Sequence, residues 1–131
     1  MSGDIVAAAR ALLGVRWRHQ GRAAETGLDC VGLCLIALKS AGIHIPHIPD
    51  YPRRHDGSLL RSALQQHLSQ IPIRHFEEGD IGLFAESGVP IHVGVLSRTG
   101  GGTVIHAHAR RRKVIEEPLA IYGMPVSVFR I

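Results

Sequence analysis

The pattern of apolar residues changes along the chain, from helical segments in the first half to a period of two in the second. Helical spacing of apolar residues predicts a helix over 58–68, and apolar segments bounded by capping signals predict helices over 5–13 and 30–41. Beyond residue 72 the period becomes two, which predicts strands over 81–85, 91–97, 103–109, 113–117 and 126–130. Helices followed by antiparallel strands are typical of an α+β fold, and we expect residues 1–131 to form a single domain.

Local signals place the ends of these elements. Asp4 is expected to cap the first helix and Gly14 to end it. The segment 45–54 contains several prolines and is expected to be an extended connector. The run Gly100–Gly102 predicts a turn that joins two strands as a hairpin. The helix 30–41 is apolar on nearly every side, so it should be central and buried.

Cys30 stands where this central helix is expected to begin, directly after Asp29. Backbone N–H groups at a helix start stabilise a thiolate, so a lowered thiol pKa and nucleophilic chemistry are expected. The alternative is that Cys30 is only a small hydrophobic residue of a buried helix. That structural interpretation is favoured for Cys34, one turn deeper. Side chains four apart on a helix do not face each other across a gap, so no disulfide is expected.

Two histidines follow in neighbouring predicted strands. His92 opens the strand 91–97, and His106 lies in the next strand, with His108 on the same face. The hairpin should make His92 and His106 cross-strand neighbours. A histidine could take the thiol proton while a second orients it. Because the chain contains 9 histidines, polar strand edges without a function remain the alternative.

A zinc site is a second hypothesis. Cys30, His92, His106 and His108 are chemically suitable ligands, but no tight Cys-x-x-Cys or His-x-x-x-His pair is present. We therefore expect no metal or other cofactor.

Composition narrows the class of partner. Aromatic residues make up 5% of the chain, which gives little material for stacking bases, so no nucleic-acid partner is expected. The net charge of +4 and the basic run Arg110–Lys113 suit either a solvated strand edge or an acidic polymer. No apolar run reaches the length of a membrane span, and no basic-then-apolar leader opens the sequence. We expect both cysteines to be thiols made in a reducing compartment.

Four motifs in order resemble the NlpC/P60 family of cell-wall cysteine peptidases. They are Asp29–Leu33, Glu78–Ile81, His92–Leu96 and Val104–Ala107, and the resemblance covers residues 5–117. It implies a papain-like α+β fold with the N-terminal helices packed on a C-terminal antiparallel sheet. It also implies Cys30 as nucleophile, His92 as general base and acid, and His106 as the residue that orients His92. The implied substrate is a peptidoglycan stem peptide, cut between γ-D-glutamate and a diamino acid.

The same resemblance suggests how substrate is held. Asp29 is implied to bind the amine end of the substrate. Trp17 stands where the family often has a tyrosine near the oxyanion site, and Val31 replaces the usual serine. An indole donates only through its N–H, so we hypothesise that His19 or Gln20 supplies a replacement donor.

The stretch 17–22 is similar to a Tyr-Arg-His-Gln-Gly segment of the phage-tail branch of this family. It implies a virion or tail-particle protein that is made in the cytoplasm, contacts phage tail proteins and acts at the cell wall. One alternative is an inactive tail subunit that binds the wall through its basic surface. A second alternative is an amidase or acyltransferase on the same fold, because the three residues Cys30, His92 and His106 do not determine the leaving group.

Overall fold

The computed structural model describes residues 2–46 and 57–131 and contains a layer of helices against an antiparallel sheet. Part of the predicted connector 45–54 lies outside the described residues. The helices are α1 (Ser2–Arg10), α2 (Cys30–Ser40), α3 (Ser58–His67) and the short α4 (Leu119–Tyr122), with 3-10 turns η1 (Ile73–His75) and η2 (Thr99–Gly101). The strands are β1 (Arg22–Ala23), β2 (Gly27–Leu28), β3 (Ser69–Ile71), β4 (Ile81–Glu86), β5 (Val89–Ser97), β6 (Thr103–His108), β7 (Lys113–Pro118) and β8 (Ser127–Arg130).

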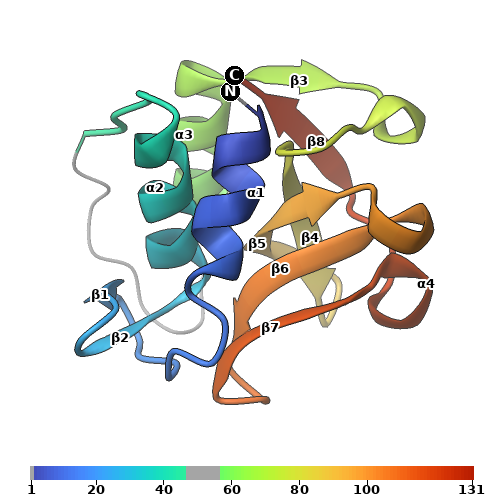
Figure 1. Cartoon of the computed structure of the whole chain (residues 1–131). Coiled ribbons are helices and arrows are strands. Elements are labelled where there is room, and N and C mark those ends of the chain that lie inside the picture. The colour runs from blue at the N-terminus through green and yellow to red at the C-terminus, as the bar shows by residue number, and fades with distance from the viewer. Residues whose placement is uncertain (1, 47–56) are drawn as a thin grey trace.

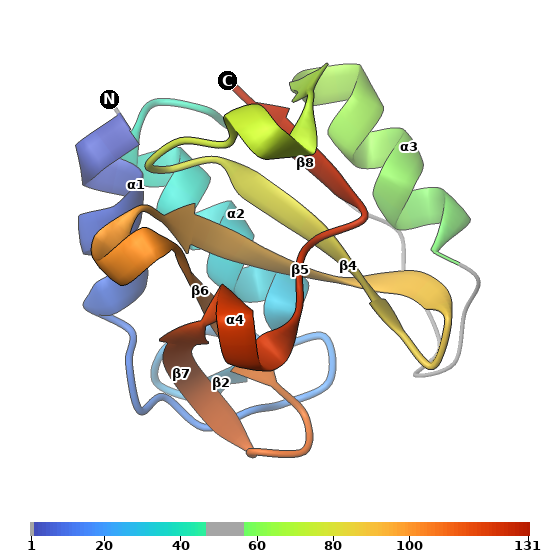
Figure 2. The same ribbon diagram turned by 90° about the vertical axis from the view of Figure 1, so that its right-hand side faces the viewer.

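The main sheet has six strands in the order β3-β8-β4-β5-β6-β7, with every neighbouring pair antiparallel. Figure 1 shows α1 and α2 side by side on one face of this sheet, and Figure 2 shows α4 and η1 on the opposite face. The predicted α+β class is therefore confirmed. Among the residues that the structure describes, no helix is both long and apolar enough to cross a membrane.

Each face of the sheet has its own apolar cluster. The larger cluster lies under the helices and includes Leu33 and Leu38 of α2 with Val93 and Ile105 of the sheet. The smaller cluster, on the other face, includes Phe84 and its neighbours. Residues alternate along each strand, so one strand serves both clusters with successive side chains. This explains why the predicted strands have few polar positions.

The strand and helix predictions agree with the structure in most places. Both the buried central helix and the hairpin at η2 are confirmed. The prediction that Asp4 caps the first helix is wrong, because α1 begins at Ser2 and Asp4 lies in its first turn. That helix also ends at Arg10, before Gly14. The short strands β1, β2 and β3 were not predicted, because two or three residues are too few to show a period.

A segment before β1 pairs with the start of the outer edge of β7. The N–H of Gly14 donates to the carbonyl of Val114 at 3.0 Å, and the N–H of Val114 donates to Val15 at 2.8 Å. The N–H of Trp17 donates to the carbonyl of Arg112 at 2.9 Å. The N-terminal loop is therefore hydrogen bonded to the last strand on this side of the sheet.

The same loop packs closely on the start of α2. A Cβ atom added at Gly32 would lie 2.0 Å from the carbonyl oxygen of Gly21, a distance that real side chains do not reach. The glycine in the motif Asp29–Leu33 is thus required by contact between two backbones. This contact fixes the loop beside the first turn of α2.

Candidate active site

Cys30 is the first residue of α2, and Asp29 caps the helix. The Oδ1 atom of Asp29 accepts a hydrogen bond from the N–H of Gly32 at 2.9 Å. This is the usual way for an N-cap side chain to satisfy an unpaired amide of the first turn. Because Asp29 caps the helix through Gly32, three residues later, Cys30 becomes the first residue of α2.

Asp29 is also the attachment point of the loop before it. Its carboxylate accepts a hydrogen bond from the N–H of Gln20 at 3.0 Å, and it forms an ion pair with Arg22 at 2.8 Å. The Asp29 side chain is buried, although it contributes to the wall of the pocket around Cys30. Its two oxygens thus have partners within the chain. The role of Asp29 in binding substrate stays a prediction.

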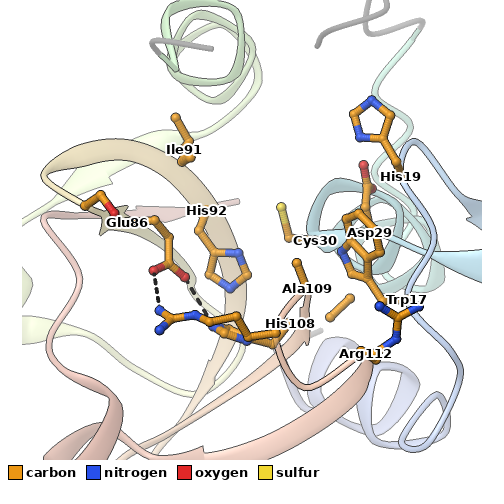
Figure 3. Close-up of a pocket in the computed structure, with 13 residues that line it drawn as sticks. Trp17, His19, Asp29, Cys30, Glu86, Ile91, His92, His108, Ala109 and Arg112 are labelled. Atoms are coloured by element: carbon orange, nitrogen blue, oxygen red, sulfur yellow. Dashed lines mark hydrogen bonds and ion pairs between the residues drawn. The ribbon is translucent and has the colours of Figure 1, made fainter. Parts of the chain in front are cut away.

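Cys30 lies in an open pocket of about 630 Å³ between α2, the loop 15–28 and the ends of β5 and β6. Trp17 and His19 line the pocket on the side of the loop, and Figure 3 shows both near Asp29. Gln20 does not belong to the described lining, and it contributes to the site through its backbone. The predicted donor roles of His19 and Gln20 are not tested by this geometry.

His92 and His106 meet on the other side of the pocket. The Nε2 atom of His92 lies 2.6 Å from the Nδ1 atom of His106, which is a short hydrogen bond. The two strands pair only from Val95 with Ile105 to Ser97 with Thr103, so both histidines lie beyond the paired segment. They are therefore offset across the gap between the strands rather than directly opposite, as the hairpin alone would suggest.

A β-bulge next to His92 helps to aim its side chain. The register of β4 against β5 shifts between Phe84 and Ala85, which leaves Ile91 as an extra residue of β5. Bulges of this kind commonly redirect side chains near active sites. Figure 3 shows His92 and Cys30 as neighbours in the pocket, one from β5 and the other from α2. The N–H of Val93, the next residue, lies close enough to the Cys30 sulfur to lower the pKa of the thiol.

The structure adds a carboxylate that sequence reasoning missed. The Oε2 atom of Glu117 on β7 lies 2.8 Å from Nε2 of His106. Val104 pairs with Glu117, and His106 is two residues further along the same face of β6. Alternation within 113–117 predicts which face of the strand Glu117 occupies. The sequence does not show the register of β7 against β6, and this register is what brings Glu117 to His106.

A second acidic contact holds His108. Its Nε2 atom lies 3.2 Å from Oε1 of Glu86, which also accepts a hydrogen bond from the Tyr122 hydroxyl at 2.7 Å. Figure 3 shows Glu86 beside His108, and its other carboxylate oxygen lies 3.4 Å from the Arg110 guanidinium. The rings of His92, His106, His108 and Tyr122 pack edge to face or tilted, with centroids 4.6–6.0 Å apart. No pattern in the sequence indicated that Glu86 and Tyr122 lie against these histidines.

The electrostatics favour a neutral thiol beside neutral imidazoles. Burial raises the pKa of Cys30 to about 12, with a further contribution from the negative charge of Asp29. The backbone N–H groups of Val93 and Val31 act in the opposite direction but do not compensate. The expected low pKa of Cys30 is therefore wrong. Burial also lowers the pKa of His92, with help from His106 and His108, and it lowers the pKa of His106.

The geometry gives no support to the zinc hypothesis. Within residues 2–46 and 57–131, no three histidine, cysteine or acidic side chains converge as metal ligands. His92 and His106 direct ring nitrogens at each other rather than at a common point. Both cysteines are free thiols, and Cys34 is buried in the helix, as its structural interpretation predicted.

Known proteins share the fold of this chain. The model of the NlpC/P60 family matches residues 14–126. The NlpC/p60 domain of the peptidoglycan hydrolase SagA is 20% identical, with a TM-score of 0.75 over 100% of this chain and 99% of that one. An NlpC/P60 family protein from Bacillus cereus is 25% identical, with a TM-score of 0.75 over 99% of this chain and 40% of that chain.

A third neighbour shows that the fold does not guarantee activity. RipD of Mycobacterium tuberculosis, a non-catalytic NlpC/p60 domain protein adapted to peptidoglycan binding, is 18% identical. Its TM-score is 0.68, over 99% of this chain and 96% of that one. No curated protein matches the chain by sequence. The family model covers most of the chain, and the chain therefore belongs to the NlpC/P60 family.

Proposed function

We propose that the protein is a cysteine peptidase that hydrolyses peptidoglycan stem peptides. The observation that carries this proposal is the 2.6 Å bond between His92 Nε2 and His106 Nδ1, formed next to a cysteine at a helix start. This bond leaves Nδ1 of His92 as the ring nitrogen available to the Cys30 thiol. A thiol, a base and a residue that orients the base are the components of covalent acyl transfer.

The proposed reaction begins with a neutral thiol. Nδ1 of His92 accepts the proton of Cys30 as the sulfur attacks the scissile carbonyl, and the backbone N–H of Cys30 stabilises the oxyanion. His92 then gives this proton to the leaving amine, and a thioester remains on Cys30. Water attacks the thioester and transfers a proton through His92 to the sulfur, which releases the acid and restores the thiol.

The finer features of the substrate come from the family resemblance. We propose the γ-D-glutamyl–diamino acid bond as the scissile bond, in agreement with a pocket wall that contains Arg112 and Arg110, the latter ion-paired with Glu86. Stem peptides carry free carboxylates, which such side chains favour. The phage-tail origin, the tail partners and action at the cell wall from a particle stay predictions that rest on 17–22 alone.

Digestion of purified muropeptides tests the proposal, with products identified by mass. We expect cleavage by the wild type and a loss of at least about 10³-fold in Cys30→Ala, because no other nucleophile replaces the thiol. Cys34→Ala is the matched control, since it removes the buried thiol of the same helix and should retain activity.

The products separate the alternatives. A mass that corresponds to loss of a whole stem peptide would indicate an amidase, and a transferred acyl group would indicate an acyltransferase. Binding to sacculi without any cleavage by the wild type would contradict the proposal. It would place this protein with the non-catalytic, peptidoglycan-binding neighbour.

A further inference from the structure

The hydrogen-bonded chain that begins at His92 continues one residue beyond the predicted triad. His106 bonds to His92 through Nδ1 at 2.6 Å and to Glu117 through Nε2 at 2.8 Å. His106 is fully buried, and the Glu117 side chain is 14% exposed. Glu117 does not line the pocket around Cys30, so it has no direct access to a bound substrate there.

The carboxylate determines where the protons of both rings lie. An ionised carboxylate only accepts hydrogen bonds, so Nε2 of His106 must carry the proton at that contact. A neutral imidazole has one N–H, which leaves Nδ1 of His106 as an acceptor. Nε2 of His92 must then donate across the 2.6 Å contact, and Nδ1 of His92 keeps its lone pair.

We propose that Glu117 is a positioning residue that sets the tautomers of His106 and His92, and thereby keeps Nδ1 of His92 able to accept the thiol proton. The inference rests on the proposed cysteine peptidase function. Without the carboxylate, each imidazole can adopt the tautomer that carries its proton on the other ring nitrogen. In the alternative arrangement Nδ1 of His92 carries a proton and cannot act as the base.

Glu117 also acts on the charge that forms during the reaction. When His92 accepts the thiol proton it becomes an imidazolium, whose positive charge is shared through the bond to His106. The negative charge of Glu117 lies one ring further along and stabilises this state without accepting a proton itself. A buried carboxylate behind a histidine has this role in serine hydrolases, where it orients the base and remains ionised.

The neighbouring residue provides a control with a different function. Glu116 lies on the opposite face of β7 and bonds to Arg10 at 2.9 and 3.0 Å and to Thr103 at 2.7 Å. These contacts connect α1 to the sheet and do not involve the histidines. Glu116→Gln therefore removes a hydrogen-bonded carboxylate from the same strand without changing the histidine chain.

The test compares Glu117→Gln with Glu116→Gln in the full chain. A glutamine has nearly the same shape, but it is neutral, and its amide can donate as well as accept. We expect kcat on muropeptides to fall about 10–100-fold in Glu117→Gln with little change in KM, as for other groups that act through a catalytic residue. Glu116→Gln should retain wild-type kcat.

Two further measurements do not depend on peptidase activity. Nitrogen-15 NMR of labelled histidine should show a single tautomer for His92 and His106 in the wild type and mixed tautomers in Glu117→Gln. The rate of Cys30 alkylation at neutral pH should fall in Glu117→Gln, since fewer His92 rings then offer an unprotonated Nδ1 to the thiol proton.

The outcomes distinguish this inference from the proposed function. Wild-type tautomers, alkylation rate and kcat in Glu117→Gln would overturn it, as would an equal loss of kcat in Glu116→Gln. Restoration of the single tautomer in Glu117→Asp would support it. If the wild type cleaves no muropeptide, the proposed function fails, while the tautomer and alkylation measurements still decide the role of Glu117.

Discussion

The two sides of the pocket are built by different means. On the helix side, Asp29 and Cys30 are adjacent in sequence, and the cap involves a residue only three positions away. On the sheet side, His92 lines the pocket and is held from behind by His106 and Glu117, and the three residues come from three strands that meet through register. Position on the helix side thus depends on local backbone geometry, whereas position on the sheet side depends on the whole sheet. The first is sensitive to loss of single hydrogen bonds, and the second to small displacements of strands.

Removing the Asp29 side chain should have the largest effect on stability. In Asp29→Ala the cap of α2 is lost, and the buried amide of Gly32 and the half-buried amide of Gln20 lose their acceptor. We expect a loss of about 2–4 kcal/mol in the free energy of unfolding, measured by urea denaturation.

Asp29→Asn separates the cap from the charge. Its amide oxygen can still accept from Gly32, but the ion pair with Arg22 is removed, so the loss should be smaller. Equal stability of Asp29→Ala and the wild type would show that the loop contacts of Gly21, and not the cap, hold the helix side together.

A substitution at Gly94 tests the sheet side. An added Cβ would lie 2.4 Å from Cγ2 of Val104 and 3.1 Å from Cβ of His106. Gly94→Ala should therefore push β6 away and cost about 1–3 kcal/mol of stability, with a loss of kcat because His106 moves from His92. Thermal unfolding and muropeptide turnover measure the two effects.

Gly88→Ala is the control, since an added Cβ there meets no atom within 4 Å, although its positive φ adds backbone strain. Retention of kcat in Gly94→Ala would mean that the histidine pair tolerates strand displacement. The contrast between the two sides of the pocket would then be weaker than the structure indicates.

The pH dependence of stability should show one signature from each side. Burial lowers the pKa of His92, so below about pH 6.5 the unfolded chain binds a proton that the folded protein excludes. Stability should therefore fall with decreasing pH, by at most about 1.4 kcal/mol per pH unit from this group. Burial raises the pKa of Cys30 to about 12, so stability should also fall above about pH 9, where the unfolded thiol ionises.

Single variants test which residues cause the acid and alkaline limbs of the stability profile. His92→Gln should reduce the slope of the acid limb, to which His106 also contributes, and Cys30→Ala should reduce the slope of the alkaline limb, because burial also raises the pKa of Cys34. Urea denaturation at several pH values measures both slopes. An unchanged alkaline limb in Cys30→Ala would contradict the raised pKa of this thiol.

The same contrast explains what could be predicted from sequence. The start of α2 was predicted at Cys30, because a cap, a glycine and an apolar period occur together in Asp29–Leu33. The strands of His92 and His106 were also predicted, since alternation is a local signal. Glu117 and Glu86 were missed because their roles depend on register and on the ends of strands. The raised pKa of Cys30 was missed because burial is a property of the folded chain.

The segment 14–17 has a consequence for how the protein behaves at high concentration. Its hydrogen bonds to Val114 of β7 and to Arg112 just before it occupy backbone groups that would otherwise extend the open edge at the start of this strand. Open edges are templates for pairing between molecules, and proteins commonly cover them. Trp17 belongs to this cover and also lines the pocket. Changes made here to alter substrate preference therefore also affect resistance to aggregation, and light scattering should be measured beside turnover.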